Sequence, residues 1–127
     1  MNWITGIVLS VLTTGASCLG QNLLSLATTY TDTCDASAAV ALDADRFVVA
    51  NDEDNILRVY SLSRPGPAIS TFNVSAFLHQ TKKQPEADLE GAARVGDRIF
   101  WISSHGASAS GNSSPNRQRF FATDLRT

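Results

Sequence analysis

Acidic side chains and one histidine stand at the borders of short apolar runs in this chain of 127 residues. Asp35, Asp88 and Glu90 precede or open such runs, Asp52 follows another, and His105 follows a fourth. Carboxylates presented by flexible segments suit calcium, a hard cation that takes roughly six to eight oxygen ligands. The four carboxylates are therefore candidate metal ligands, and Glu90 and His105 are also candidates for acid–base chemistry.

A second polar group follows His105. The loop GASASGNSSPNRQ, residues 106–118, is long for a connection between neighbouring strands, and loops of this length are often functional. Arg117 lies near its end and Arg119 directly after it. Together with His105 these arginines are candidates to bind a phosphate or carboxylate group of a substrate. The alternative is that His105 is an ordinary surface histidine and that both arginines are solvated. In the same way, the acidic segment NDED, residues 51–54, can be an ordinary turn.

Short β-rich runs separated by turn residues organise the chain. The first group covers 37–42, 46–51, 56–62 and 68–74, and the second covers 90–95, 98–104 and 119–125. Asp, Asn, Gly and Pro fill most of the intervals, as turns require. No stretch of 37–75 or 90–125 keeps an amphipathic helical period. The pattern predicts an all-β fold made of antiparallel four-stranded meanders.

The two groups of strands repeat one another. Asp35 aligns with Asp88, Ser37 with Glu90 and Ala39 with Ala92, and after a gap of one residue Asp45-Arg46 aligns with Asp97-Arg98. A unit of about 50 residues with four strands is typical of a β-propeller blade.

A propeller ring needs roughly four to eight such blades, and this chain holds about two. We therefore expect blade one at 35–75 and an incomplete blade two at 88–127, within a partial propeller domain at 33–127. This would make the chain an amino-terminal piece of a longer protein. The alternative is that the two sheets pack as a small sandwich.

The direction of the strands places the polar groups. In a meander, the start of the first strand lies at the same end as the turn between the second and third strands. Asp35, Asp52, Asp88 and Glu90 should therefore meet with His105 at one end of the sheets, which we call the acidic rim. The opposite rim receives only hairpin turns.

Charge and hydropathy exclude some classes of function. Ten Lys and Arg residues against 12 Asp and Glu residues leave a net charge of -2, without the basic surface that nucleic-acid binding needs. Residues 3–19 are uncharged and mostly apolar or small, so residues 1–20 read as a signal peptide of a secreted or periplasmic protein. This segment is too short and too polar for a stable membrane span. Cleavage would leave Cys34 alone, and we expect a small buried thiol there.

Three blocks of sequence carry a resemblance. CDASAAVALDADRFVVANDEDNILRVYSL, PEADLEGAARVGDRIFWISSHG and PNRQRFFATDL resemble an uncharacterised family of secreted, mainly bacterial proteins that are predicted β-propellers with a domain of unknown function. The block Asp88–Gly91 is also remotely similar to the acidic block of phytase-like and esterase-like propellers. That likeness implies Glu90 as a calcium ligand or acid–base residue, with His105 and Arg117 as substrate contacts.

Three functions remain open from the sequence. The first is an extracytoplasmic propeller-like protein that binds a ligand or metal ion on the acidic rim. The second is a calcium-dependent hydrolase of phosphoesters or esters that uses Glu90, Asp88 and His105. The third is purely structural, with polar residues that only cap the strand ends.

Overall fold

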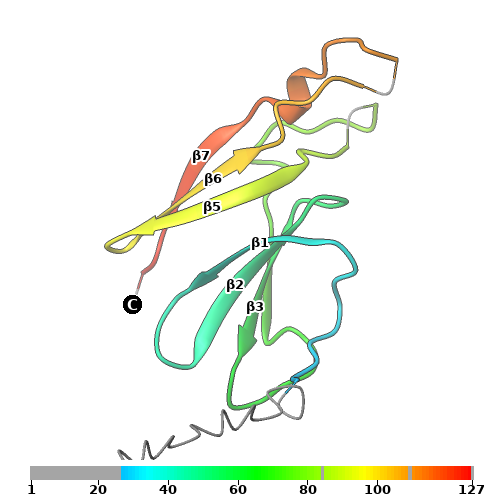
Figure 1. Ribbon diagram of the computed structural model, residues 1–127. Helices are drawn as coiled ribbons and strands as arrows, with labels where there is room; N and C mark the ends of the chain where they lie inside the picture. Colours follow the sequence, from blue (N-terminus) through cyan, green and yellow to red (C-terminus); the bar gives the residue numbers. More distant parts are fainter. Residues whose placement is uncertain (1–26, 84, 109, 127) are drawn as a thin grey trace, which may run out of the picture.

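The computed structural model describes residues 27–126 except 84 and 109 (Figure 1). The predicted signal peptide, residues 1–20, lies outside this part of the chain. The described residues form two antiparallel sheets, and no α-helix occurs among them. Accordingly, this part of the chain offers no helix with the length and apolar character to cross a membrane.

Both sheets are meanders in which neighbours in sequence are neighbours in space. The first sheet consists of β1 (Ala36–Ala41), β2 (Arg46–Asn51), β3 (Ile56–Ser61) and β4 (Ser70–Asn73), and the second of β5 (Leu89–Val95), β6 (Arg98–Ser103) and β7 (Phe120–Asp124). All seven strands lie where the sequence predicts them, with ends that differ by at most two residues. The prediction of antiparallel meanders is confirmed.

Local chemistry closes the two corresponding hairpins. Between β1 and β2, the Asp43 carboxylate accepts hydrogen bonds from the backbone N–H groups of Asp45 and Arg46, at 2.9 and 2.7 Å. Between β5 and β6, Gly96 has a φ of +61°, a left-handed conformation that glycine adopts without steric cost. These turns place Asp43 and Asp97 at the rim opposite the acidic rim.

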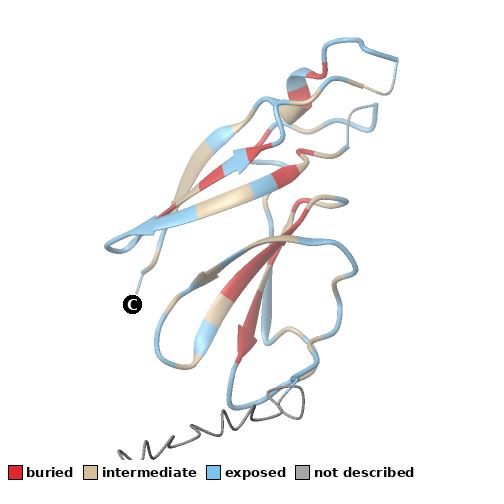
Figure 2. Cartoon of the chain, in the orientation of Figure 1, coloured by how far each residue is buried: buried red, intermediate tan, exposed pale blue. Residues whose placement is uncertain are grey.

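The core lies between the two sheets. Val48, Ala50, Leu57 and Val59 of the first sheet meet Leu89, Ile99 and Trp101 of the second, and these residues are buried together with Leu78 and Ala87 (Figure 2). β1 packs against β5. Both strands carry small residues, such as Ala38 and Ala92, which let the backbones approach. Each large apolar side chain buried here contributes about 1.5–3 kcal/mol to stability.

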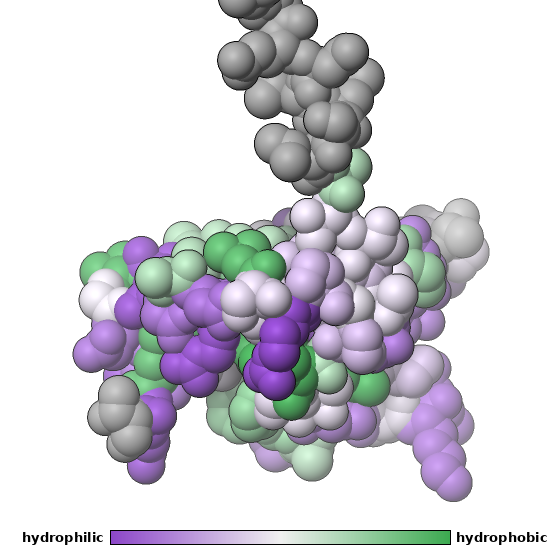
Figure 3. Space-filling view, turned by 90° about the horizontal axis from the view of Figure 1, so that it is seen from below, coloured by the Kyte–Doolittle hydropathy of each residue, from purple (hydrophilic) through white to green (hydrophobic). Residues whose placement is uncertain are grey.

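The far faces of the two sheets differ. On the first sheet, the ring of Tyr30 lies edge-on against Phe47 and Tyr60, and the Tyr60 hydroxyl donates a hydrogen bond to the Thr31 carbonyl at 2.7 Å. The segment before β1 thus covers part of that face. On the second sheet, large apolar residues of β6 and β7 stay exposed. Seen from below, the surface is a mosaic of hydrophilic and hydrophobic side chains (Figure 3).

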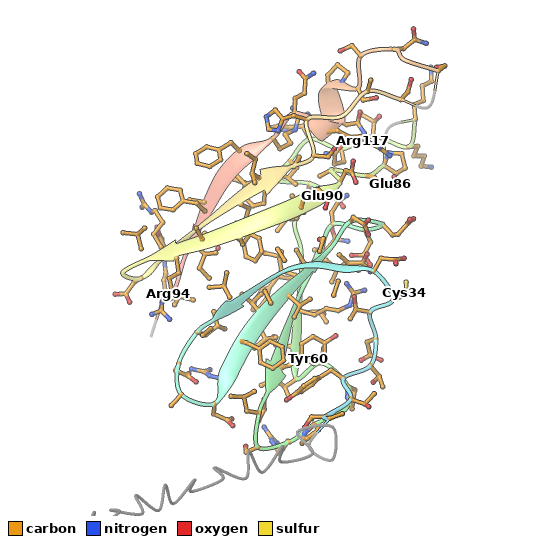
Figure 4. The ribbon with its side chains drawn as sticks, viewed as in Figure 1. Cys34, Tyr60, Glu86, Glu90, Arg94 and Arg117 are labelled. Carbon is orange, nitrogen blue, oxygen red and sulfur yellow. The ribbon has the colours of Figure 1, made fainter. Side chains whose placement is uncertain are left out.

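The prediction of a buried thiol is wrong. Cys34 is exposed and makes no disulfide, and it lies in the segment that leads into β1 (Figure 4). The core cluster consists of residues of the two sheets and of the connection between them, and the segment that carries Cys34 contributes no residue to it.

Candidate cation-binding site on the acidic rim

Matching irregularities at the start of β1 and β5 position the rim. The pairing of β1 with β2 shifts between Ala36 and Ala38, and the pairing of β5 with β6 shifts between Leu89 and Gly91. Such a bulge adds a residue to one strand and turns its side chain in a new direction. The extra residue of β5 is Glu90, which is exposed, while the preceding Leu89 is buried in the core.

A hydrogen bond between the sheets fixes the same point. Ser37, at the bulge of β1, donates its hydroxyl to the carbonyl oxygen of Leu89. This bond holds the peptide before Glu90 against the first sheet. At the opposite rim, Arg94 donates to the carbonyls of Ala41 and Leu42, so the sheets are tied at both ends.

Carboxylates from separate segments meet at this rim. One side-chain oxygen each of Asp52, Asp88 and Glu90 lie within 4.8 Å of one another, and the same holds for Asp35, Asp52 and Glu53. Asp52 belongs to both groups and is half-buried. The four residues predicted as metal ligands, Asp35, Asp52, Asp88 and Glu90, are thus divided between two groups that share Asp52, and Glu53 belongs to the group of Asp35.

Two aspartates in the loop after β2, Asp52 and Asp54, differ in their partners. The side chain of Asp54 forms an ion pair with Arg58 at 2.7 Å. Burial opposes ionisation of Asp54, but hydrogen bonds from Arg58 and the Ile56 N–H outweigh it and lower its pKa. Asp52 pairs with no cation in the part of the chain that the structure describes. Its Oδ1 atom is buried without a hydrogen bond among the described residues, which is costly for a charged group.

A buried asparagine anchors the segment that carries Asp88. Asn55 donates to Ser75 Oγ at 3.0 Å and to the Pro85 carbonyl at 2.6 Å, and its Oδ1 accepts the N–H of Ala87 at 2.8 Å. Residues 85–87 are thus fixed directly before Asp88. From the other side, the buried Asn116 donates to the Glu86 carbonyl at 2.6 Å. These two amides hold the connection between the sheets against both neighbouring loops.

Arg117 lies beside the acidic group rather than apart from it. It sits at the end of the short 3-10 turn η2 (Pro115–Arg117), and its guanidinium pairs with Glu86 and with Asp88, both at 3.2 Å. Figure 4 shows Arg117, Glu86 and Glu90 at the same end of the second sheet. The expected substrate contact of Arg117 therefore competes with two existing ion pairs. Arg119 is half-buried and forms no ion pair with any described residue, and its carbonyl accepts the Ser103 N–H at 3.0 Å.

His105 is held by the backbone next to the acidic rim. Its N–H donates to the Arg117 carbonyl at 2.9 Å, and its Nδ1 lies 2.9 Å from the Ser103 carbonyl. Because a carbonyl oxygen only accepts, Nδ1 carries the hydrogen, and in the neutral ring Nε2 has the lone pair. His105 is exposed and adopts a left-handed φ of +55°. It therefore presents Nε2 as the basic nitrogen of the ring.

The sequence did not identify Glu86 or Ser104 as members of the site. Glu86 pairs with Arg117, and the Ser104 hydroxyl donates to Asp88 Oδ2. One signal was present for Glu86, because residues two apart on an extended segment point to the same side. Ser104 lies at the strand end that the sequence assigns to the rim, but its contact with Asp88 depends on how the segment before β5 meets the end of β6.

Comparison with protein-family models, with curated proteins and with solved structures finds no match to this chain. The site is therefore interpreted from its own geometry.

Proposed function

We propose that this chain is an exported β-propeller-like protein that binds a divalent cation, most suitably calcium, on its acidic rim, and through it a ligand. The observation that carries this proposal is the shared position of Asp52 in two groups of converging carboxylates, with its Oδ1 buried and without a hydrogen-bond partner in the described part of the chain. Calcium takes carboxylate oxygens in flexible geometry and tolerates partly solvated sites.

Charge repulsion supports a cation at this point. Five carboxylates, of Asp35, Asp52, Glu53, Asp88 and Glu90, crowd the rim, and Arg117 is the described cation that pairs with one of them. Like charges in such proximity repel one another. A bound divalent cation relieves this repulsion and gives Asp52 Oδ1 an electrostatic partner.

The propeller part of the proposal has its own support. Both sheets have consecutive strand order, their first strands pack on each other, and both first hairpins carry a bulge at the position aligned by the repeat. These features are the ones expected of consecutive blades, and they support this part of the proposal. Further blades of a longer protein would then complete the ring.

Export and weak calcium binding fit one another. Extracellular calcium modules bind with dissociation constants of about 10⁻⁴–10⁻³ M. The rim has exposed Asp35, Glu53 and Glu90, with half-buried Asp52 and Asp88. The uncharged segment 3–19 supports export.

The geometry favours binding over hydrolysis. A phosphoester or ester hydrolase would need Arg117 to contact substrate, yet this side chain is engaged by Glu86 and Asp88. His105 offers a basic Nε2, but it is exposed and receives no orienting carboxylate among the described residues. We therefore place hydrolysis second.

A thermal melt followed by circular dichroism tests the proposal. The full chain is melted with and without millimolar calcium, beside Asp52→Asn and the matched control Asp97→Asn. Asp97 lies on the opposite rim with a side chain 85% exposed. A ligand in about hundredfold excess over its dissociation constant adds about 2.7 kcal/mol to the stability of the folded state.

We expect calcium to raise the midpoint of the wild type and of Asp97→Asn, and to leave Asp52→Asn unchanged. The variant itself should be at least as stable as the wild type without calcium, because it removes one charge from a repulsive group. A wild-type midpoint indifferent to calcium would rule out the proposed cation site.

A further inference from the structure

We infer that a polar hollow beside the acidic rim binds a small acidic sugar. The hollow has a volume of about 440 Å³, and the described residues that line it come from the connection before β5 and from the loop between β6 and β7. These two segments lie beside each other in Figure 1. Most of the lining side chains are serine hydroxyls and asparagine amides, and the others are Lys83, Pro85 and the ion pair of Glu86 with Arg117.

Hydrogen bonds within the loop hold its wall of the hollow in shape. The Ser108 hydroxyl accepts the Asn112 N–H at 3.1 Å, and the Ser108 N–H donates to the Asn112 carbonyl at 2.9 Å. Gly111 closes this turn with a left-handed φ of +79°. Asn116 then ties the loop to the connection, because its Nδ2 donates to the Glu86 carbonyl at 2.6 Å. A ligand therefore meets a largely preformed surface, which lowers the entropic cost of binding.

Two buried residues of this wall have hydrogen-bonding capacity that no described residue uses. Ser114, which is 8% exposed, stands at the N-cap position of η2, yet its side chain makes no capping hydrogen bond. Asn116, which is 7% exposed, uses its Nδ2 on the Glu86 carbonyl, and its Oδ1 accepts from no described residue. Buried polar groups are normally hydrogen-bonded. A ligand in the hollow that Ser114 and Asn116 line would satisfy both.

Lys83 gives the hollow an uncompensated positive charge. It is exposed, and it pairs with none of the carboxylates in the described part of the chain. Glu86 in the lining is already paired with Arg117 at 3.2 Å, and Arg117 also pairs with Asp88. A carboxylate or phosphate group that enters the hollow therefore finds in Lys83 a cation without a competing partner, and hydrogen bonds between charged groups are the strong ones.

These groups together fit a polyhydroxylated molecule with one negative group. A sugar hydroxyl both donates and accepts, as the hydroxyl of Ser114 does, and it can donate to Oδ1 of Asn116. The volume lies within the range of small-molecule sites, roughly 300–1,000 Å³. Pro85 is the apolar residue among the described lining, so an apolar ligand would find little surface to bury against. Lys83 accepts a carboxylate or a phosphate alike, and both occur on sugars.

Nuclear magnetic resonance titration of the isotope-labelled full chain tests the inference with glucuronate, glucose 6-phosphate and uncharged glucose, which share the same ring. The buffer contains a chelator, so that no divalent cation takes part. We expect at least one acidic sugar to bind with a dissociation constant of about 1 mM, the order that a ligand of this size reaches. Glucose should bind at least about tenfold more weakly, because it lacks the charged contact. The more tightly bound acidic sugar identifies the anionic group.

Variants of two neighbouring lysines locate the site. Lys83→Gln should weaken the binding of the acidic sugar by about tenfold or more, to the level of glucose. Lys82→Gln is the matched control and should bind like the wild type, because Lys82 is exposed on the same turn but does not line the hollow. Ser114→Ala should weaken binding by about fivefold without lowering the melting midpoint, since its side chain caps no backbone group.

Three results would overturn the inference. These are no binding of either acidic sugar at about tenfold above the expected dissociation constant, equal affinity for glucose and the acidic sugars, or equal affinity of Lys83→Gln and Lys82→Gln. The inference does not require the proposed cation site, because Asp52 and Glu90 do not line the hollow. Stabilisation by calcium without sugar binding would reject the sugar site alone. Sugar binding by a chain that calcium does not stabilise would reject the cation site alone.

Discussion

Replacement of Asn55 by alanine should destabilise the protein strongly and loosen the acidic rim. The side chain of Asn55 is buried, with 5% exposure, and makes three hydrogen bonds to residues 75, 85 and 87. Each is worth about 1 kcal/mol net. The Ala87 N–H is completely buried, so its loss of a partner adds about 1–3 kcal/mol. We expect Asn55→Ala to lose about 4–6 kcal/mol of unfolding free energy, a large share of the roughly 5–15 kcal/mol of a typical domain.

Urea unfolding followed by far-ultraviolet circular dichroism measures this loss. We expect the dependence of the unfolding free energy on urea concentration to be the same for the variant and the wild type. Asn73→Ala is the control, because Asn73 is exposed and its Oδ1 accepts one bond, from the Ser75 N–H at 2.9 Å. It should cost about 1 kcal/mol or less. The calcium-induced shift of Asn55→Ala should also shrink, since Asp88 follows the segment that Asn55 anchors. A loss equal to that of Asn73→Ala would refute the reasoning that Asn55 holds the connection.

Two further predictions concern pH and the core. Hydrogen bonds from the backbone of Asp45, then from the side chain and backbone of Arg46, lower the pKa of Asp43 to about 2. A carboxylate whose pKa is lowered by folding stabilises the protein above about pH 4, and this contribution is lost as the pH falls to about 2. Between pH 5 and pH 2.5, Asp43→Asn should therefore lose less stability than the wild type, as measured by urea titrations. Trp101→Ala should lower the unfolding free energy by about 3–5 kcal/mol, as measured by calorimetry, because removal of the buried indole leaves a cavity. The indole also stacks on Phe121 and donates a hydrogen bond to Thr123 Oγ1. A loss near 1 kcal/mol would place Trp101 outside the core.

The sequence alone determined the strands and their order. Alternating apolar residues and turn residues act over a few positions, so a run such as RFVVAN, which became β2, was identifiable without any distant partner. Neighbouring strands in a meander need only short turns, and for that reason the order of both sheets followed as well. The same alternation of ends predicted that Asp35, Asp52, Asp88 and Glu90 lie at one rim, and the structure brings Asp52 near Asp35 in one group and near Asp88 and Glu90 in another.

The tertiary structure decided which polar groups pair and which surfaces are covered. Arg117 meets Glu86 across 31 positions of sequence, and Asn55 meets Ala87 across 32. Cys34 is exposed because it precedes the first strand, although its residue type favours burial. Contacts of this kind depend on how closely the sheets approach and on where the bulges at Ser37 and Glu90 turn the chain. Local sequence patterns specify the strands, whereas the packing of one sheet on the other sets these distances.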